Sequence, residues 1–289
     1  MRKELPADLS YEALAKERLD YPYFEGADDF PFEPENTEFS ATNAWWLAEI
    51  SLLAYVTDSN FVREQLARAG LLEVFFLERE STHGFVAANA EATIVAFRGT
   101  DDATDVLSDL RALLTPEGEG RVHQGFQDAL NLVWTEFAAL LGKRDCWFTG
   151  HSLGAALATV AAVRHHRRVR ALYTFGSPRV GDADLVASCD FPAFRVVNNN
   201  DLVTRLPPPV AYRHVGELKY FDADRKLRDD PDLWDRIAEQ VTGHASRIAE
   251  NVRRWLDGDF KAIPYDSLVD HAPVHYAIHA WNHLAESRS

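Results

Sequence analysis

Strands and helices alternate through the middle of this 289-residue chain, and this alternation constrains the fold more than any other feature. Four short apolar runs have the length and composition of buried strands: 92–97, 146–149, 171–175 and 194–197. Between them, Gln127–Leu141 and Leu153–Arg164 place apolar residues on one helical face. This order predicts an α/β fold with a mostly parallel central sheet flanked by helices on both faces.

The whole chain, residues 1–289, is predicted to form a single domain, because no Gly/Ser linker or internal repeat divides it. Residues 1–40 are expected to be an N-terminal arm, since the stretch 20–36 holds three prolines and five aromatic residues, which favours an extended segment pinned onto the body. Residues 222–262 are expected to be a helical insertion that could cap the functional site described below. Further elements are expected outside the core: a helix from Ala41, a hairpin of 74–77 with 85–88, an edge hairpin over Tyr212–Phe221, and an amphipathic helix over 232–256.

The pentapeptide Gly150-His151-Ser152-Leu153-Gly154 lies where a predicted strand meets a predicted helix. This is the context of a nucleophile elbow, in which a serine occupies a tight turn that leaves no room for neighbouring Cβ atoms. The N-terminus of the following helix also favours an oxyanion formed beside it. The motif therefore indicates a nucleophilic serine, and an ordinary glycine-rich turn is the weaker interpretation because both flanking elements are present.

A serine hydroxyl needs a base, and the base needs a carboxylate that orients it. After a nucleophile elbow, the carboxylate is expected at a later strand end, and the histidine is expected after the carboxylate. Asp201 fits this order because it follows the 194–197 strand across three asparagines. Asp182 also follows a strand, but its position is equally natural for capping a helix. Asp201 is therefore favoured, and Asp182 stays as the alternative.

Eleven histidines compete for the role of base. His123 precedes the serine and breaks the expected chain order, and His151 is expected to point away from the site along the elbow. Four histidines near the C-terminus are spaced by four residues: His271, His275, His279 and His283. This spacing can imitate a metal site, but one amphipathic helix explains the last three, and no metal is expected. His271 stands just before Pro273, in the loop that enters this helix, so it is the predicted base and His275 is the alternative.

Two backbone amides are needed to bind the oxyanion. Leu153 follows the nucleophile and is predicted to supply the first. Thr100 is predicted to supply the second, because it ends an earlier strand and the preceding Gly99 permits a sharp bend.

Seven segments together resemble the class 3, fungal-type triacylglycerol lipase family: FRGT (97–100), HQGF (123–126), GHSLG (150–154), TFGSPRVGD (174–182), NNDLVTRLPP (199–208), YRHVG (212–216) and DH (270–271). They occur in the order of that family. The resemblance implies an α/β-hydrolase fold, ester hydrolysis without a cofactor, a triad of Ser152, Asp201 and His271, and oxyanion amides from Thr100 and Leu153. The chain departs from the family at Val106, where Trp is frequent, and at Thr204, where Pro is usual.

Composition excludes several classes of protein. The formal net charge of −15 disfavours binding to nucleic acid or to an anionic membrane surface. Two cysteines, Cys146 and Cys189, cannot make a disulfide framework. The apolar run 44–56 is too short to span a bilayer, and no N-terminal apolar segment follows the first basic residues. We expect an acidic globular protein without stable membrane insertion, cytoplasmic or, if a leader has been removed, secreted.

The expected activity is that of a triacylglycerol lipase or esterase that hydrolyses acyl esters through an acyl-enzyme intermediate. The family commonly places a lid after FRGT, and residues 101–120 offer a short helix with an apolar side that suits acyl chains and contact with a lipid interface, although a plain surface helix fits equally. Two alternatives stay open from the sequence. One is a lipase-like binding or regulatory protein without catalysis, and the other is a phospholipase or acyltransferase with the same triad.

Overall fold

The computed structural model describes residues 2–9, 14, 17–100, 113–229, 250, 253–254, 257–259 and 269–287. The helices and strands within these residues are, in chain order, α2 (Ala41–Leu53), α3 (Ser59–Arg68), β1 (Glu73–Arg79), β2 (Thr82–Ala88), β3 (Thr93–Phe97), β4 (Leu114–Glu117), β5 (Gly120–His123), α5 (Gln124–Leu141), β6 (Cys146–His151), α6 (Leu153–Arg164), η1 (His166–Arg168), β7 (Val169–Phe175), α7 (Ala183–Ser188), β8 (Ala193–Asn198), η2 (Val203–Arg205), β9 (Glu217–Phe221), β10 (Leu227–Arg228) and α10 (Pro273–Ser287).

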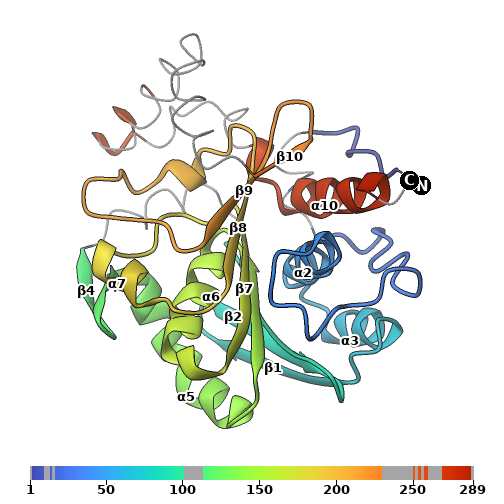
Figure 1. Cartoon of the computed structure of the whole chain (residues 1–289), viewed down its shortest axis with the longest axis horizontal. Helices are drawn as coiled ribbons and strands as arrows, with labels where there is room; N and C mark the ends of the chain where they lie inside the picture. The colour runs from blue at the N-terminus through green and yellow to red at the C-terminus, as the bar shows by residue number, and fades with distance from the viewer. Residues whose placement is uncertain are drawn as a thin grey trace.

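One eight-stranded sheet runs through the molecule in the order β1-β2-β3-β6-β7-β8-β9-β10 (Figure 1). The five strands from β3 to β9 in this order are parallel, whereas β1, β2 and β10 pair antiparallel with their neighbours at the two edges. Strands β4 and β5 form a separate two-stranded ribbon. The mostly parallel sheet predicted from the sequence is confirmed.

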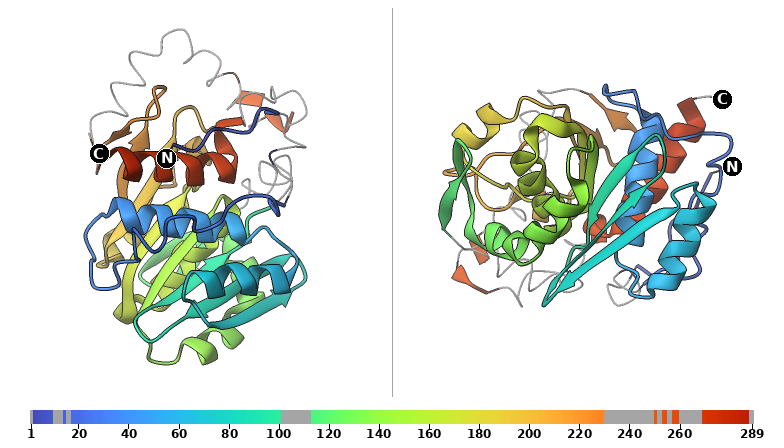
Figure 2. Two further views of the ribbon diagram at one scale, coloured as in Figure 1. Left: turned by 90° about the vertical axis from the view of Figure 1, so that its right-hand side faces the viewer. Right: turned by 90° about the horizontal axis from the view of Figure 1, so that it is seen from below.

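Helices cover both faces of the sheet (Figures 1 and 2). On one face, α2 and α10 share a core with Ile94 and Ala96 of β3, and on the other face α5 and α6 share a core with Val95 and Phe97 of the same strand. Side chains alternate between the faces of a strand, so a strand buried on both faces needs an unbroken apolar run. The apolar run Ile94–Phe97 of β3 is continuous for this reason.

The N-terminal arm packs against α2. Residues 17–40 contain no helix or strand, and Tyr23 in this segment is buried. Glu49 on α2 is fully buried; its carboxylate accepts hydrogen bonds from Tyr21 Oη at 2.7 Å and Trp45 Nε1 at 2.9 Å. Burial raises the pKa of Glu49. The carboxylate thus joins the arm to the helix that covers the sheet. The limits of the arm at 40 and of the 222–262 insertion stay predictions.

The edge hairpin predicted over Tyr212–Phe221 is wrong. Only β9 of this range is a strand; it pairs in parallel with β8, and its antiparallel partner is β10. Arg213 makes an isolated bridge to Gly181 instead of continuing the strand. A short apolar segment does not by itself reveal which neighbour a strand pairs with.

Two expected helices fall on residues that the structure mostly does not describe. For the helix expected within 101–120, residues 101–112 lie outside the described ranges, and Leu114 belongs to β4, which pairs with β5. Most of the helix expected over 232–256 also lies outside the described ranges. Among the described residues, no helix is long and apolar enough to cross a bilayer.

Candidate active site

The GHSLG segment forms a sharp turn between β6 and α6. Ser152 follows the last residue of β6 and adopts φ 59° and ψ −126°, a left-handed backbone conformation that is strained for a residue with a Cβ atom. A Cβ atom on Gly150 would collide with the backbone of Gly154, and one on Gly154 would collide with the carbonyl oxygen of Phe97. The crowding predicted from the two glycines is therefore present at both positions.

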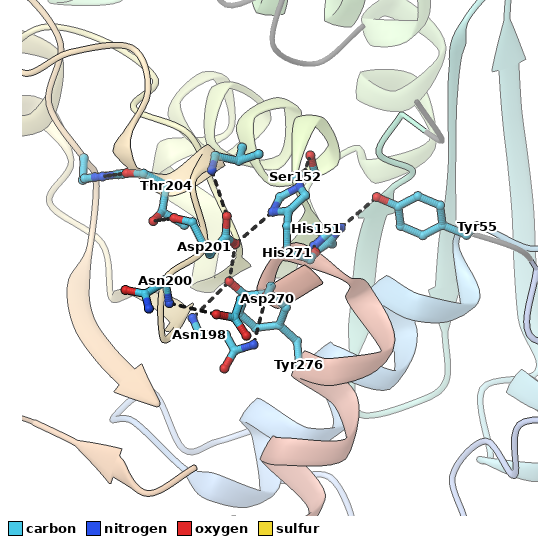
Figure 3. A network of polar contacts seen from close by, with 12 residues as sticks. Tyr55, His151, Ser152, Asn198, Asn200, Asp201, Thr204, Asp270, His271 and Tyr276 are labelled. Atoms are coloured by element: carbon cyan, nitrogen blue, oxygen red, sulfur yellow. Dashed lines mark hydrogen bonds and ion pairs between the residues drawn. The ribbon is translucent and has the colours of Figure 1, made fainter. Parts of the chain in front are cut away.

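The imidazole of His271 lies over this turn (Figure 3). His271 ends the short turn 269–271 that leads into α10, and its Nε2 is 2.8 Å from Ser152 Oγ. Ser152 is 1% exposed and His271 is 7% exposed, so the contact is nearly shielded from water. The loop position predicted for His271, just before the C-terminal helix, is confirmed.

The carboxylate of Asp201 completes a chain of contacts. Asp201 follows β8, is fully buried, and holds His271 Nδ1 at 2.8 Å with Oδ2. Its Oδ1 accepts the amide hydrogen of Val203 at 2.9 Å, and its carbonyl oxygen accepts the hydroxyl hydrogen of Thr204 at 2.8 Å. Thr204, where the family usually has Pro, thus stabilises the turn that carries the carboxylate.

Tyr276 is a fourth member of this series of hydrogen bonds, and it is not among the residues predicted from the sequence. Its hydroxyl donates to Asp201 Oδ2 at 2.6 Å and accepts from the amide of Asn198 at 3.1 Å. Burial, reinforced by the charge of Asp201, raises the pKa of Tyr276 well above its ordinary value, so the hydroxyl keeps its proton. Tyr276 lies one turn into α10, and no motif in the sequence marks it.

The loops that carry the acid and the base are joined by asparagines. Asn198 Nδ2 donates to the carbonyl oxygen of Asp270 at 2.9 Å, and the Asp270 carboxylate accepts from Asn199 Nδ2 at 2.9 Å and the amide of Asn200 at 3.2 Å. Burial raises the pKa of Asp270. These bonds fix the residue before His271 to the residues before Asp201, two segments about 70 positions apart in the chain.

The two residues predicted as oxyanion donors lie near the elbow. The register of β3 with β6 pairs Phe97 with Gly150, so the chain leaves β3 toward Thr100 at the same sheet edge where Ser152 stands. Leu153 is the first residue of α6, so its amide has no carbonyl within the helix to donate to. A Cβ atom on Gly99 would collide with Tyr55 Oη and lie 2.7 Å from the carbonyl oxygen of His151. Close packing, rather than a sharp bend, is the reason for glycine at 99.

The alternative site residues have other structural roles. Asp182 is the N-cap of α7, accepting the amide hydrogen of Leu185 at 3.0 Å, and it pairs with Arg121 at 2.8 Å. His123 lies at the start of α5 with its ring stacked on a phenylalanine. His275 is buried within α10, where burial lowers its pKa to about 4. In the described part of the chain, no group of three or more His, Cys, Asp or Glu side chains could hold a metal ion.

His151 does not point away from the site, contrary to the expectation. Its ring lies against that of His271, with 4.5 Å between ring centroids, and its two nitrogens contact Tyr55 Oη and the backbone carbonyl of His271. The histidine next to the nucleophile contacts the base because His271, from a distant part of the chain, packs against the end of the strand that carries His151.

A serine on a strand-to-helix turn, with a histidine and a buried carboxylate at the edge of a mostly parallel sheet, defines the class of α/β-hydrolases. Residues 94–211 match the model of the family described as lipase (class 3). The chain is 34% identical to a lipase of Rhizomucor miehei over 213 residues, covering 66% of this chain and 54% of that protein. It is 46% identical to the secreted mono- and diacylglycerol lipase 1 of Fusarium solani over 114 residues, covering 35% of this chain and 34% of that protein.

A solved structure of a Rhizomucor miehei lipase deletion mutant in a propeptide complex shares the fold, with a TM-score of 0.53 at 22% identity, covering 77% of this chain and 83% of that one. The chain resembles the class 3 lipase family through residues 94–211, and its fold is that of the α/β-hydrolases. The resemblance and the fold predicted from the sequence are confirmed. The chain spans about half or less of the length of the two curated relatives.

Proposed function

We propose that the protein is a carboxylic ester hydrolase of the lipase and esterase type, with Ser152 as nucleophile, His271 as base and Asp201 as the orienting carboxylate. The observation that carries the proposal is the unbroken series of contacts from Ser152 Oγ through the imidazole to Asp201 Oδ2, both at 2.8 Å. Resemblance to the class 3 lipase family supports the same reaction.

The geometry suits acyl transfer in two stages. The Asp201 carboxylate can only accept a hydrogen bond, so it holds the proton of His271 on Nδ1 and leaves the Nε2 lone pair facing Ser152. As Ser152 Oγ bonds to the ester carbonyl carbon, His271 Nε2 takes the hydroxyl proton and then gives it to the departing alcohol. Water attacks the resulting acyl-enzyme with the same base, which releases the carboxylic acid and restores the serine.

The oxyanion formed in each stage needs donors at the elbow, and the amides of Leu153 and Thr100 are proposed for this role. The N-terminus of α6, directly after Ser152, also favours negative charge. Loss of one donor in comparable sites costs about 3 kcal/mol of transition-state stabilisation.

The proposed substrates are lipid acyl esters, because the family acts on esters of this kind. The two relatives are named as a lipase and as a mono- and diacylglycerol lipase. The relative from Fusarium solani is named as secreted, and we extend the proposal to a secreted enzyme. The expected cytoplasmic location has no support among these relatives.

The test is hydrolysis of p-nitrophenyl esters from acetate to palmitate, followed by triolein emulsions and phospholipid vesicles. Ser152→Ala should abolish hydrolysis, whereas the matched control Ser51→Ala, which removes a buried hydroxyl bonded to Thr149 Oγ1, should retain it. Retained hydrolysis in Ser152→Ala contradicts the assignment of the nucleophile. Preference for acetate contradicts the lipase assignment, release of fatty acid from phospholipid alone favours a phospholipase, and folded wild-type protein without any turnover favours a binding protein.

A further inference from the structure

His151 is a buried titratable group that the proposed reaction does not use. It is 2% exposed, and the rings of three titratable residues lie against it: Tyr55, His271 and Tyr276. Burial, followed by the proximity of His271, lowers the pKa of His151 well below its ordinary value. The imidazole is therefore neutral, with one nitrogen that carries a hydrogen and one that does not.

The contacts of His151 decide which nitrogen carries the hydrogen. Nε2 lies 2.6 Å from the backbone carbonyl oxygen of His271, which can only accept, so Nε2 is the donor. Nδ1 then has the lone pair and accepts from the hydroxyl of Tyr55 at 2.8 Å. The direction of both hydrogen bonds follows: the Tyr55 hydroxyl donates to His151, and His151 donates to the backbone of the proposed base (Figure 3).

Tyr55 and His151 also contact the segment that leads to Thr100, the proposed oxyanion donor. Tyr55 lies two residues after the end of α2, and its hydroxyl packs so closely on Gly99 that a Cβ atom there would collide with it. The carbonyl oxygen of His151 lies against the same glycine. Gly99 precedes Thr100, so one hydrogen-bonded pair contacts both the backbone before the oxyanion donor and the backbone of the base.

We propose that Tyr55 and His151 are positioning residues that hold the backbone of His271 and the segment before Thr100 in the geometry required for acyl transfer. The Tyr55 hydroxyl holds the imidazole of His151 through Nδ1, and His151 in turn holds the carbonyl of His271 through Nε2. The inference rests on the proposed function. It goes beyond the triad because neither side chain needs to touch the substrate or the reacting atoms.

The kinetic consequence is a specific pattern of non-additivity. Without the Tyr55 hydroxyl, Nδ1 of His151 loses its donor, and the imidazole loses the hydrogen bond that holds it against the carbonyl oxygen of His271. Tyr55→Phe should therefore lower kcat about ten-fold and leave KM unchanged. In His151→Gln, the amide nitrogen replaces the Nε2 donor and no ring nitrogen needs the Tyr55 hydroxyl, so kcat should stay within about threefold of the wild type, and adding Tyr55→Phe should cost little more.

Three controls separate positioning from a general loss of structure. His151→Leu, which removes the donor, should lower kcat more than His151→Gln. Tyr173→Phe removes another buried hydroxyl, one that accepts from the amide of Ser40 at the opposite end of α2 from Tyr55, and should change the melting temperature without changing kcat. Equal losses from Tyr55→Phe in the wild-type and His151→Gln backgrounds would overturn the proposal, as would equal kcat values for Tyr55→Phe and Tyr173→Phe.

Nitrogen NMR of protein labelled at histidine gives a readout that does not depend on hydrolysis. We expect His151 to be neutral and protonated at Nε2 at about pH 6.5, where an ordinary histidine is half protonated, and Tyr55→Phe to shift the resonances of both His151 and His271. An Nδ1–H tautomer in the wild type, or unchanged His271 resonances in Tyr55→Phe, would overturn the proposal. If this pattern is found in a protein that hydrolyses no ester and does not react at Ser152, the proposed function fails and the hydrogen-bond assignment stands.

Discussion

Gly176 offers a way to disturb the acid and the base without removing either. It follows β7 with φ +60°, and a Cβ atom at this position would lie 2.9 Å from Asp201 Oδ2 and 3.0 Å from His271 Nδ1. Ordinary van der Waals contact begins at 3.4 Å, so Gly176→Ala must displace the carboxylate or the imidazole by several tenths of an ångström. The bond between these two groups is the one that orients the base.

Two separate costs follow from Gly176→Ala. The left-handed backbone conformation costs an alanine about 1–2 kcal/mol of folding stability. The displaced imidazole should lower kcat about ten-fold or more, because a shift of about 1 Å in a catalytic group can cost about a hundred-fold. The assay combines steady-state hydrolysis of a p-nitrophenyl ester with urea unfolding of the same preparation.

The matched control is Gly142→Ala. Gly142 has φ +55°, and no heavy atom lies within 4 Å of the Cβ position, so this variant meets a comparable backbone strain without a contact to the site. It should lose stability and keep its kcat. Equal kcat values for the Gly176 and Gly142 variants would refute the reasoning, because the activity would then be insensitive to the geometry between the acid and the base.

Three further predictions concern residues outside the proposed triad. Tyr276→Phe removes the hydroxyl that donates to Asp201 and should lower kcat about ten-fold at unchanged KM in steady-state kinetics. Asp182→Ala removes the cap of α7 and should cost about 1 kcal/mol in urea unfolding with kcat unchanged; lost activity would instead make Asp182 the acid. Burial lowers the pKa of His275 to about 4 and that of His279 to about 3, from 6.5 in the unfolded chain. Between these values the unfolded chain binds more protons than the folded protein. The free energy of unfolding should therefore have its full value above about pH 6.5 and decrease as the pH falls through about 4. A free energy of unfolding that stays constant in urea melts over this range would contradict the prediction.

The elbow could be predicted from the sequence because its requirements are local. Gly150 and Gly154 are needed within a few residues of Ser152, and the strand and helix on either side are visible as apolar patterns. Asp201 and His271 are less strongly indicated, since the sequence shows only their order in the chain and their positions at a strand end and before a helix. The structure brings both to the elbow through hydrogen bonds between segments that are far apart in sequence.

The contacts that the sequence does not reveal depend on which helix or strand packs against which. Tyr276 reaches Asp201 because α10 packs beside the end of β8, and His151 reaches beneath His271 for a related reason. Neither contact leaves a periodic pattern. The hairpin predicted over Tyr212–Phe221 is wrong for the same reason, because β9 pairs with β8 and β10 and not with the residues just before it.

The most direct test of the central claim is the site at which a fluorophosphonate reacts, located by intact mass and peptide mapping of the folded protein. Attack by an activated serine hydroxyl on phosphorus expels fluoride and leaves one stable phosphonyl group. We expect a single adduct on Ser152, no adduct in Ser152→Ala, and much slower labelling in His271→Ala. An adduct on another serine, or folded wild-type protein that gains no mass, would contradict it.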